Sequence, residues 1–358
     1  MKAANSFGQH LVITTFGESH GAAMGVVIDG CPSEVPFDMK LLIKELERRR
    51  PGQHGQKNSV VSDREEKDQP EVLSGVYDGK TLGTPIAIII RNQDQRSQDY
   101  AKIAKEPRPG HADDTWKIKF GHTDPRGGGR SSGRETSARV MGGAVAQMLL
   151  RELCPELSIT GFASSIGSVQ MSSDEIDTVK KQLQQNDQLD IDSFAARLPN
   201  KKKSEEVEAM LLSGKKEGRS YGGVVEVNIF NPPAGLGQPV FHKLKNDLAS
   251  AFMSVGATAA VELGAGALVA EAEGSEFHSQ SDSSHYGGVR GGISTGETIT
   301  FKVYFKPTAT VLHAAKQGRH DPCIVPRAIP VLEAMAALVI ADHILLGATD
   351  RLSNLLKK

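Results

Sequence analysis

Five arginines crowd into the stretch between residues 108 and 139, together with two histidines and a run of three glycines. Guanidinium groups bind phosphate and carboxylate oxygens through paired hydrogen bonds. The glycines at 127–129 have no side chains, so the backbone there can come close to a ligand. The stretch therefore predicts a site for an anionic ligand, with the charged residues Arg108, Arg126, Arg130, Arg134 and Arg139.

The second half of this stretch predicts the start of a helix near residue 133. Ser132 and Glu135 have the spacing of a capping box, and Ala138, Met141 and Val145 follow at helical intervals. The first N–H groups of a helix have no intrahelical acceptor and lie at the positive end of the helix dipole, which favours a bound phosphate. A solvated glycine turn before an ordinary helix is the alternative interpretation.

The elements upstream of this stretch predict a second group of candidate residues. Runs rich in β-branched residues at 11–15 and 24–28 predict two strands. The loop that joins them carries Glu18, Ser19 and His20, which are polar and can exchange protons.

A third group of candidates lies at the end of a predicted helix. Asp38 predicts the N-cap of a helix over 39–50, which ends in Arg48, Arg49 and Arg50. Arginines in a last helical turn complement the helix dipole, and they can equally bind an anion. Both interpretations remain open from the residues alone.

The rest of the chain predicts strands and helices within a single domain of residues 1–358. Alternating and apolar runs predict strands at 71–75, 85–90, 223–230, 257–270 and 298–305, and helices at 174–185, 204–214 and 241–253. The segment at about 172–218 is strongly polar. We expect it to form a solvated helical excursion from the domain.

Composition limits the classes of function. The formal net charge is −1 and charged residues make up 24% of the chain, so no general attraction for nucleic acid or a membrane is expected. The three cysteines, Cys31, Cys154 and Cys323, are widely separated, which favours a reducing compartment, and the N-terminus lacks the apolar core of a signal peptide. The apolar run at 334–346 contains Asp342 and predicts a buried core helix. We expect a cytoplasmic protein.

Three histidines lie in predicted loops beside glycine or aspartate: His20, His111 and His320. A histidine among phosphate-binding arginines can act as an acid or stabilise developing negative charge, although a structural role is commoner. Asp321, beside Arg319, is a candidate base or an ion-pair partner, and the sequence leaves both roles open.

Two His-x-Asp pairs offer an alternative chemistry: His111 with Asp113, and His122 with Asp124. These residues could ligate a metal for phosphoester hydrolysis, which makes a metal-dependent phosphohydrolase the alternative function. Their spacing does not bring them together on one helix face, so we predict no metal site. A non-enzymatic polyanion-binding module is disfavoured by the aromatic content of 5%.

Three long motifs follow one another in the order of one enzyme family: GESHGAAMGVVIDGCP at 17–32, GGGRSSGRETSARV at 127–140 and RHDPCIVPRAIPVLEAM at 319–335. Shorter matches extend the similarity nearly from end to end, at 94–100, 108–113, 233–241 and 305–310. The chain resembles the chorismate synthase family.

This resemblance implies an α+β fold in which helices are sandwiched between antiparallel β-sheets. It also implies a lyase of the shikimate pathway, which converts 5-enolpyruvylshikimate 3-phosphate to chorismate and phosphate by a 1,4-anti elimination. The resemblance implies that this reaction would require reduced FMN without net redox change. The resemblance further implies a homotetramer of the monofunctional type, which depends on an external flavin reductant, and it links the enzyme with NADPH.

Matching positions imply roles for particular residues. The catalytic residues would be His20, His111, Asp321, Ser19 and Ser132. The flavin would be bound by Arg130, Ser131, Ser132, Gly256, Ala257, Gly291, Lys306, Pro307, Thr308, Ala309, Thr310 and Arg319. The substrate would be bound by Arg49, Arg108, Arg134, Arg139 and Arg327.

The chain departs from the family pattern at three places. Val12 stands in a strand where the family commonly has an arginine. The loop at 52–68 lacks the arginine that usually follows the arginine run, so Lys57 or Arg64 is a candidate replacement. The segment 254–264 lacks a usual lysine-glycine pair, which affects side-chain contacts there and not backbone contacts.

Overall fold

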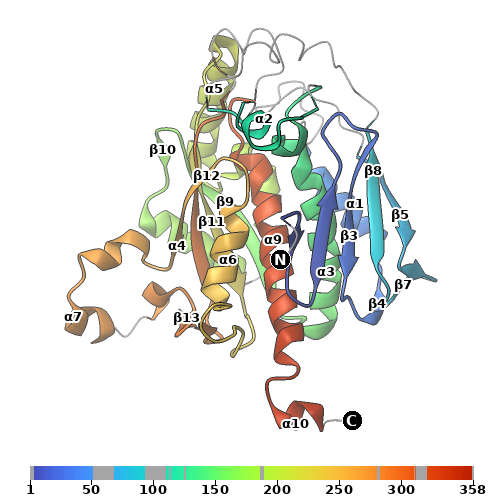
Figure 1. Ribbon diagram of the computed structural model, residues 1–358. Helices are drawn as coiled ribbons and strands as arrows, with labels where there is room; N and C mark the ends of the chain where they lie inside the picture. The colour runs from blue at the N-terminus through green and yellow to red at the C-terminus, as the bar shows by residue number, and fades with distance from the viewer. Residues whose placement is uncertain are drawn as a thin grey trace.

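The computed structural model describes residues 4–50, 68–92, 110–112, 114–124, 126–185, 189–279, 283–309, 311 and 321–356. Two five-stranded antiparallel sheets form the outer layers (Figure 1). The first has the order β1-β2-β3-β8-β5, with β1 Ser6–Phe7, β2 Val12–Phe16, β3 Ala23–Asp29, β8 Ile86–Arg91 and β5 Pro70–Ser74. The predicted strands at 11–15, 24–28, 71–75 and 85–90 are confirmed.

The second sheet has the strand order β10-β9-β11-β15-β12. Its strands are β9 Ser158–Ile166, β10 Val169–Gln170, β11 Gly223–Phe230, β12 Thr258–Leu263 and β15 Ile299–Phe305. Residues along β15 alternate between buried and half-buried, as the period-two pattern predicts. Two smaller sheets combine β4 Ser33–Pro36 with β6 Val76–Tyr77 and β7 Lys80–Leu82, and β13 Val289–Arg290 with β14 Ile293–Ser294.

Four helices lie between the two large sheets: α1 Met39–Arg49, α3 Thr136–Leu153, α6 Leu244–Met253 and α9 Val325–Gly347 (Figure 1). Helix α3 packs on β2 and β3, whereas α9 packs on β9 and β11, and the two helices contact each other. The predicted α+β class, with helices between antiparallel sheets, is confirmed. Asp38 caps α1 as predicted, since its carboxylate accepts from the N–H groups of Lys40 and Leu41.

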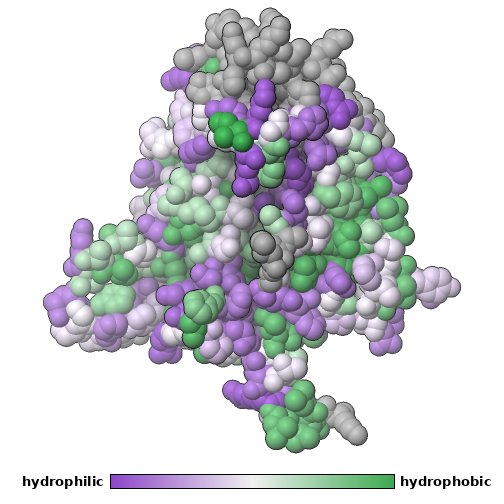
Figure 2. Space-filling view, viewed as in Figure 1, coloured by the Kyte–Doolittle hydropathy of each residue, from purple (hydrophilic) through white to green (hydrophobic). Residues whose placement is uncertain are grey.

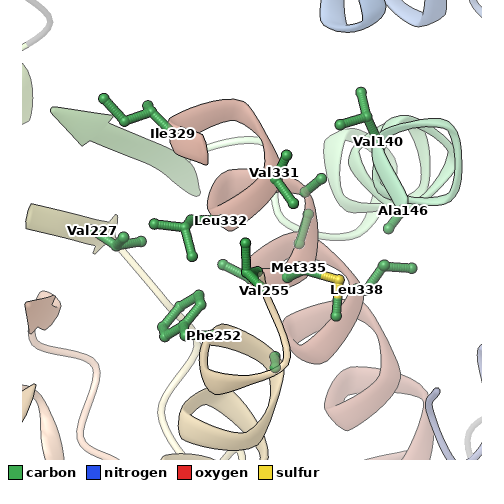
Figure 3. Close-up of a cluster of buried hydrophobic side chains, with 14 of the residues drawn as sticks. Val140, Ala146, Val227, Phe252, Val255, Ile329, Val331, Leu332, Met335 and Leu338 are labelled. Atoms are coloured by element: carbon green, nitrogen blue, oxygen red, sulfur yellow. The ribbon is translucent and has the colours of Figure 1, made fainter. Parts of the chain in front are cut away.

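Helix α9 is the centre of the hydrophobic core. Figure 3 shows its Leu332 and Met335 among apolar side chains from α3, α6 and β11. The helix is long and apolar enough to cross a membrane, but 83% of its most apolar window is buried inside the protein. Its Asp342 accepts hydrogen bonds from the backbone N–H groups of Gln9, His10 and Leu11 at 2.7–2.8 Å. The prediction of a buried core helix is therefore confirmed.

The polar segment at 172–218 contains α4 Ser173–Gln184 and α5 Lys201–Glu217, with short 3₁₀ helices η5 Ile191–Ser193 and η6 Ala195–Arg197 between them. Its second half packs on the rest of the protein, because Leu198, Val207 and Leu211 are fully buried. The remaining short elements are α2 Thr115–Phe120, α7 Gly274–Ser279, α10 Leu352–Leu355, η3 Gly129–Ser131, η4 Gly133–Glu135, η7 Gly266–Ala270 and η8 Ser284–Tyr286.

Helix α6 begins at Leu244, three residues later than the predicted start at 241. The N–H of Leu244 donates to the carbonyl of Gly292 at 2.8 Å, and Phe241 bonds within a turn to Pro239. These tertiary and turn contacts replace the first helical turn. A helix propensity read from the sequence cannot include them.

Two adjacent glycines, Gly142 and Gly143, allow α3 to lie close to both β2 and α9. A Cβ at Gly143 would lie 2.3 Å from the Cβ and 2.5 Å from the Cα of Ala334 on α9. A Cβ at Gly142 would meet only side-chain atoms of Ile13, at 3.0 Å and beyond. The α3–α9 contact thus depends on Gly143.

We predict that Gly143→Ala lowers the free energy of unfolding by about 1–3 kcal/mol, because the two helices must separate to admit a methyl group. Gly142→Ala is the matched control. It should stay within about 1 kcal/mol of the parent, since the gain in helix propensity offsets a small shift of Ile13. Urea unfolding followed by circular dichroism measures both. Equal stabilities of the two variants would contradict the proposed helix contact.

Candidate active site

The β2–β3 loop and the glycine run meet at one end of the sandwich. Gly127 has φ +142°, and a Cβ there would lie 2.4 Å from Nδ1 of His20 and 3.1 Å from Oγ of Ser19. Only a glycine fits at this distance. The Ser19 hydroxyl and His20 Nδ1 are 3.0 Å apart, which orients the imidazole ring. Two segments more than 100 residues apart in sequence are therefore in contact.

His111 reaches the same end of the molecule from another loop. A Cβ at Gly128 would lie 3.4 Å from Cε1 of His111 and 3.4 Å from Cβ of Ser132. Lys306 contacts this loop through its side chain, because its Nζ donates to the carbonyl of Gly110 at 3.1 Å. The backbone N–H of Lys306 donates to the carbonyl of Ala257 at 3.0 Å. Figure 2 shows hydrophilic residues gathered on this face around and below α2.

The helix start differs from the predicted capping box. The structure has the 3₁₀ turn η4 before α3, and the Ser132 hydroxyl accepts from the N–H of Arg134 at 3.3 Å. Glu135 does not reach back to Ser132, because its carboxylate binds Arg139 at 3.1 Å. The Ser131 hydroxyl donates to the carbonyl of Gly128 at 2.6 Å, so its hydrogen is used within the turn. The predicted capping box is therefore wrong, although a helix does begin here.

Three carboxylates hold five of the predicted arginines. Asp68 pairs with Arg49 at 3.5 Å and Arg134 at 2.9 Å. Glu135 pairs with Arg139 at 3.1 Å and lies 3.6 Å from Arg130. Asp321 pairs with Arg327 at 3.0 Å. These eight groups carry an excess of two positive charges, and burial strengthens the field that they present to an anionic ligand.

The arginines are also anchored to the backbone. Arg49, 1% exposed, donates to the carbonyl of Gly133 at 2.7 Å and to Oγ1 of Thr136 at 3.1 Å. Arg130 donates to the carbonyls of Gly17 at 3.2 Å and Thr15 at 3.3 Å. These contacts connect α1, the β2–β3 loop and the start of α3.

Arg139 connects α3 to the turn after α6. It donates to Oγ of Ser254 at 2.6 Å and to the carbonyl of Ser254 at 3.2 Å. Gly256 and Ala257 follow one residue later, and an added Cβ at Gly256 would meet no atom within 4 Å. The backbone at Gly256 therefore borders open space, as expected of a position that a ligand approaches.

Asp321 lies where the end of β15 meets the start of α9. Its Oδ2 accepts from Arg327, and its backbone carbonyl accepts from the Thr308 hydroxyl at 2.8 Å. Its Oδ1 is buried and has no hydrogen-bond partner among the described residues. Burial raises the pKa of the nearby Cys323 thiol to about 12, so this cysteine stays protonated and is not a nucleophile.

One predicted flavin residue lies away from this cluster. Gly291 is in the β13–β14 turn, and Figure 1 places β13 at the end of the molecule opposite α2. The neighbouring Gly292 contacts the start of α6, whereas Gly256 follows the end of α6. A ten-residue helix spans about 15 Å, so a single copy of the chain keeps Gly291 apart from Gly256.

Several predicted residues fall outside the described part of the chain: Arg108, Asp113, Thr310, Arg319, His320, Lys57 and Arg64. Pro307 and Ala309 lie with Lys306 and Thr308 in the described segment after β15. Val12, where the family commonly has arginine, is half-buried in β2.

The metal-site alternative gains no support. Among the described residues, no group of three or more histidine, cysteine, aspartate or glutamate side chains could hold a metal ion. Asp124 instead pairs with Arg126 at 2.8 Å, and the hydrogen bonds from Arg126 hold the pKa of the Asp124 carboxyl below its usual value. Arg126 is half-exposed and lies outside the arginine–carboxylate cluster.

Asn92 joins Arg134 to the β2–β3 loop. The sequence patterns did not single it out. Its Oδ1 accepts from Nε of Arg134 at 2.8 Å. Its Nδ2 donates to the carbonyl of Gly21 at 2.8 Å and to that of Glu18 at 3.3 Å. Asn92 thus holds Arg134 against the loop that carries His20. Asn92 follows the predicted buried strand and precedes the charged motif at 94–100. This position was the signal in the sequence that could have marked it as a candidate.

Comparisons with known proteins agree with this arrangement. A family model described as chorismate synthase matches residues 11–345. The chain belongs to the chorismate synthase family. A chorismate synthase of Bdellovibrio bacteriovorus is 60% identical over 350 residues, covering 98% of this chain and all of that protein. One from Synechococcus elongatus is 44% identical, covering 95% and 97% of the two chains.

A solved structure supports the same conclusion. A crystal structure of chorismate synthase has a TM-score of 0.75 and 31% identity to this chain, covering 98% of this chain and 96% of the other. The predicted function, a chorismate synthase of the shikimate pathway and hence a lyase, is thereby confirmed.

We predict that Asn92→Asp lowers kcat/KM for chorismate formation by tenfold or more. The carboxylate still accepts from Arg134 but loses both N–H donors and repels the carbonyls of Glu18 and Gly21. Asn231→Asp is the matched control, because Asn231 is exposed and its Nδ2 also donates to a backbone carbonyl, that of Glu156. Steady-state rates within threefold of the parent for Asn92→Asp would refute the bridging role.

Proposed function

We propose that the chain performs the 1,4-anti elimination of phosphate from 5-enolpyruvylshikimate 3-phosphate to give chorismate, with reduced FMN bound beside the substrate. The observation that carries this proposal is the convergence of His20, His111 and Asp321 on one arginine-rich end of the fold. When bound, reduced FMN supplies electron density to the breaking C–O bond and a basic N5 for the proton from C6.

The substrate would lie against the arginine–carboxylate cluster. Its phosphate and two carboxylates match guanidinium forks, and each arginine has five N–H donors, more than its carboxylate partner uses. Arg49, Arg134, Arg139 and Arg327 would supply these contacts, together with Arg108. The excess positive charge of the cluster supports binding of a polyanion.

The flavin would lie between the glycine turn and the segment after β15. Arg130, Ser131 and Ser132 would border it on one side, and Gly256, Ala257 and residues 306–309 on the other, with Thr310 and Arg319. The open space at Gly256 and the buried Oδ1 of Asp321 support a polar ligand at this place. Both are features that a bound group would fill or satisfy.

The proton-transfer roles follow from the contacts of each group. His111, beside Gly128 and Ser132, would hold a proton near the leaving phosphate. His20, oriented by Ser19, would carry positive charge next to the reduced flavin. Asp321 would accept a proton at Oδ1, because Arg327 holds Oδ2. The Ser132 hydroxyl accepts from a backbone N–H and so keeps its own hydrogen for donation.

We also propose a cytoplasmic homotetramer that takes reduced flavin from an external reductant. Three free cysteines accord with a reducing compartment. Gly291 lies too far from Gly256 to reach the same flavin within one copy, so a second copy would supply it. Sedimentation velocity with and without FMN tests the assembly.

The function predicts equal amounts of phosphate and chorismate under anaerobic conditions with dithionite-reduced FMN. Oxidised FMN should support neither product. Chorismate absorbance and phosphate release, followed in parallel, measure the outcome. Phosphate without chorismate, or turnover without flavin, would refute the proposal and favour a phosphohydrolase.

The residue roles predict that His111→Ala and Asp321→Ala each lower kcat by about 100-fold or more, as expected for the loss of a general acid or base. His278→Ala and Asp177→Ala are controls, because these residues are exposed on α7 and α4. Single-turnover rates with reduced FMN measure the chemical step. A change below threefold, equivalent to less than about 1 kcal/mol in the barrier, would show that the assigned role is wrong.

A further inference from the structure

A buried arginine outside the candidate active site binds two backbone carbonyls. Each carbonyl belongs to the residue that directly precedes an arginine of the site. Arg197, in η6, is 4% exposed. Its guanidinium donates to the carbonyl of Arg48 at 2.8 Å and to the carbonyl of Pro326. Arg48 precedes Arg49, and Pro326 precedes Arg327. One side chain thus joins the end of α1 to the start of α9.

Both carbonyls lack the usual helical donor. Helix α1 ends at Arg49, so the carbonyl of Arg48 has no intrahelical partner. The carbonyl of Pro326, in the first turn of α9, would accept from residue 330 in a regular helix. That residue is Pro330, which has no N–H. Arg197 therefore satisfies two buried acceptors that the helices themselves leave open.

A network of charges holds Arg197 in place. Its Nε pairs with Oδ1 of Asp192 at 2.5 Å, and Oδ2 of the same carboxylate pairs with Arg48 at 2.7 Å. Arg48 also pairs with Glu333 of α9 at 2.6 Å and with Glu45 at 3.0 Å. The network connects α1, α9 and the 172–218 segment at a single buried point.

The backbone of η6 is held in an unfavourable conformation. Ala196 has φ +55° and Arg197 has φ +57°, values that residues with a Cβ rarely adopt. Such a conformation persists only where the surrounding contacts determine it. In this conformation the Arg197 guanidinium contacts Asp192 and the two carbonyls.

We propose that Arg197 is a positioning residue that sets the distance between Arg49 and Arg327 without touching the substrate. This inference rests on the proposed role of those two arginines in substrate binding. A lysine cannot replace Arg197, because one ammonium group cannot bind a carboxylate and two separate carbonyls as a planar guanidinium fork does.

The test compares Arg197→Lys with the parent in steady-state kinetics and in binding of FMN. KM for 5-enolpyruvylshikimate 3-phosphate should rise at least tenfold, while kcat and the Kd for FMN change less than threefold. The flavin contacts proposed above lie mainly on other elements, so general damage to the fold would weaken FMN binding as well. Arg151→Lys is the matched control, because Arg151 contacts the other end of α1 through Asp38 and is exposed.

The outcomes separate this inference from the proposed function. A folded Arg197→Lys variant with unchanged KM overturns the positioning role, and so does a parallel loss of FMN binding.

If Arg197→Lys does not fold, Asp192→Asn is tested in its place, because this substitution loosens Arg197 without removing it. A KM rise of threefold or more with normal FMN binding then supports the inference, and an unchanged KM overturns it. Failure of the proposed function would show in the parent enzyme, which would form no chorismate.

Discussion

A guanidinium group that leaves water must be surrounded by carboxylates and carbonyl oxygens, and this requirement organises the candidate active site. Asp68, Glu135 and Asp321 each hold one or two of the arginines. The backbone carbonyls of Gly17, Thr15 and Gly133 accept further N–H groups. Arg49 binds the start of α3, Arg130 binds β2 and the loop after it, and Arg139 binds the turn after α6. The cluster therefore fixes the relative positions of these elements.

Helix α9 carries both the hydrophobic core and its main polar anchors. Its apolar residues fill the space between α3, α6 and the second sheet (Figure 3). Glu333 accepts from the N–H of Gly161 in β9, and Asp342 holds the backbone before β2. The start of the same helix bears Arg327. The core and the site therefore share one rigid element, which positions Arg327.

Much of the fold was predictable from local patterns. The alternation in β15 and the apolar period of α3 each indicated the correct element, because side chains on one face of a strand or helix are buried together. Asp38 indicated the start of α1, because its carboxylate accepts from the first N–H groups of the helix. The capping box at Ser132 was wrong for a tertiary reason. Glu135 is drawn to Arg139 and Arg130 and is not available to the helix end. The segment 172–218 was predicted as solvated, yet it buries Arg197 and Leu198.

The sequence by itself predicted most element types and an anionic ligand, and through three ordered motifs it determined the family. The predicted strand at 257–270 is the exception, because β12 ends at Leu263 and η7 occupies Gly266–Ala270. Only the tertiary structure decided which residues meet. Gly127 lies on His20, Asn92 joins Arg134 to the β2–β3 loop, and Gly291 lies at the opposite end of α6 from Gly256. These pairings connect residues far apart in the chain, and they depend on how sheets and helices pack. Local sequence patterns report burial and backbone preference, so they carry no information about such distances.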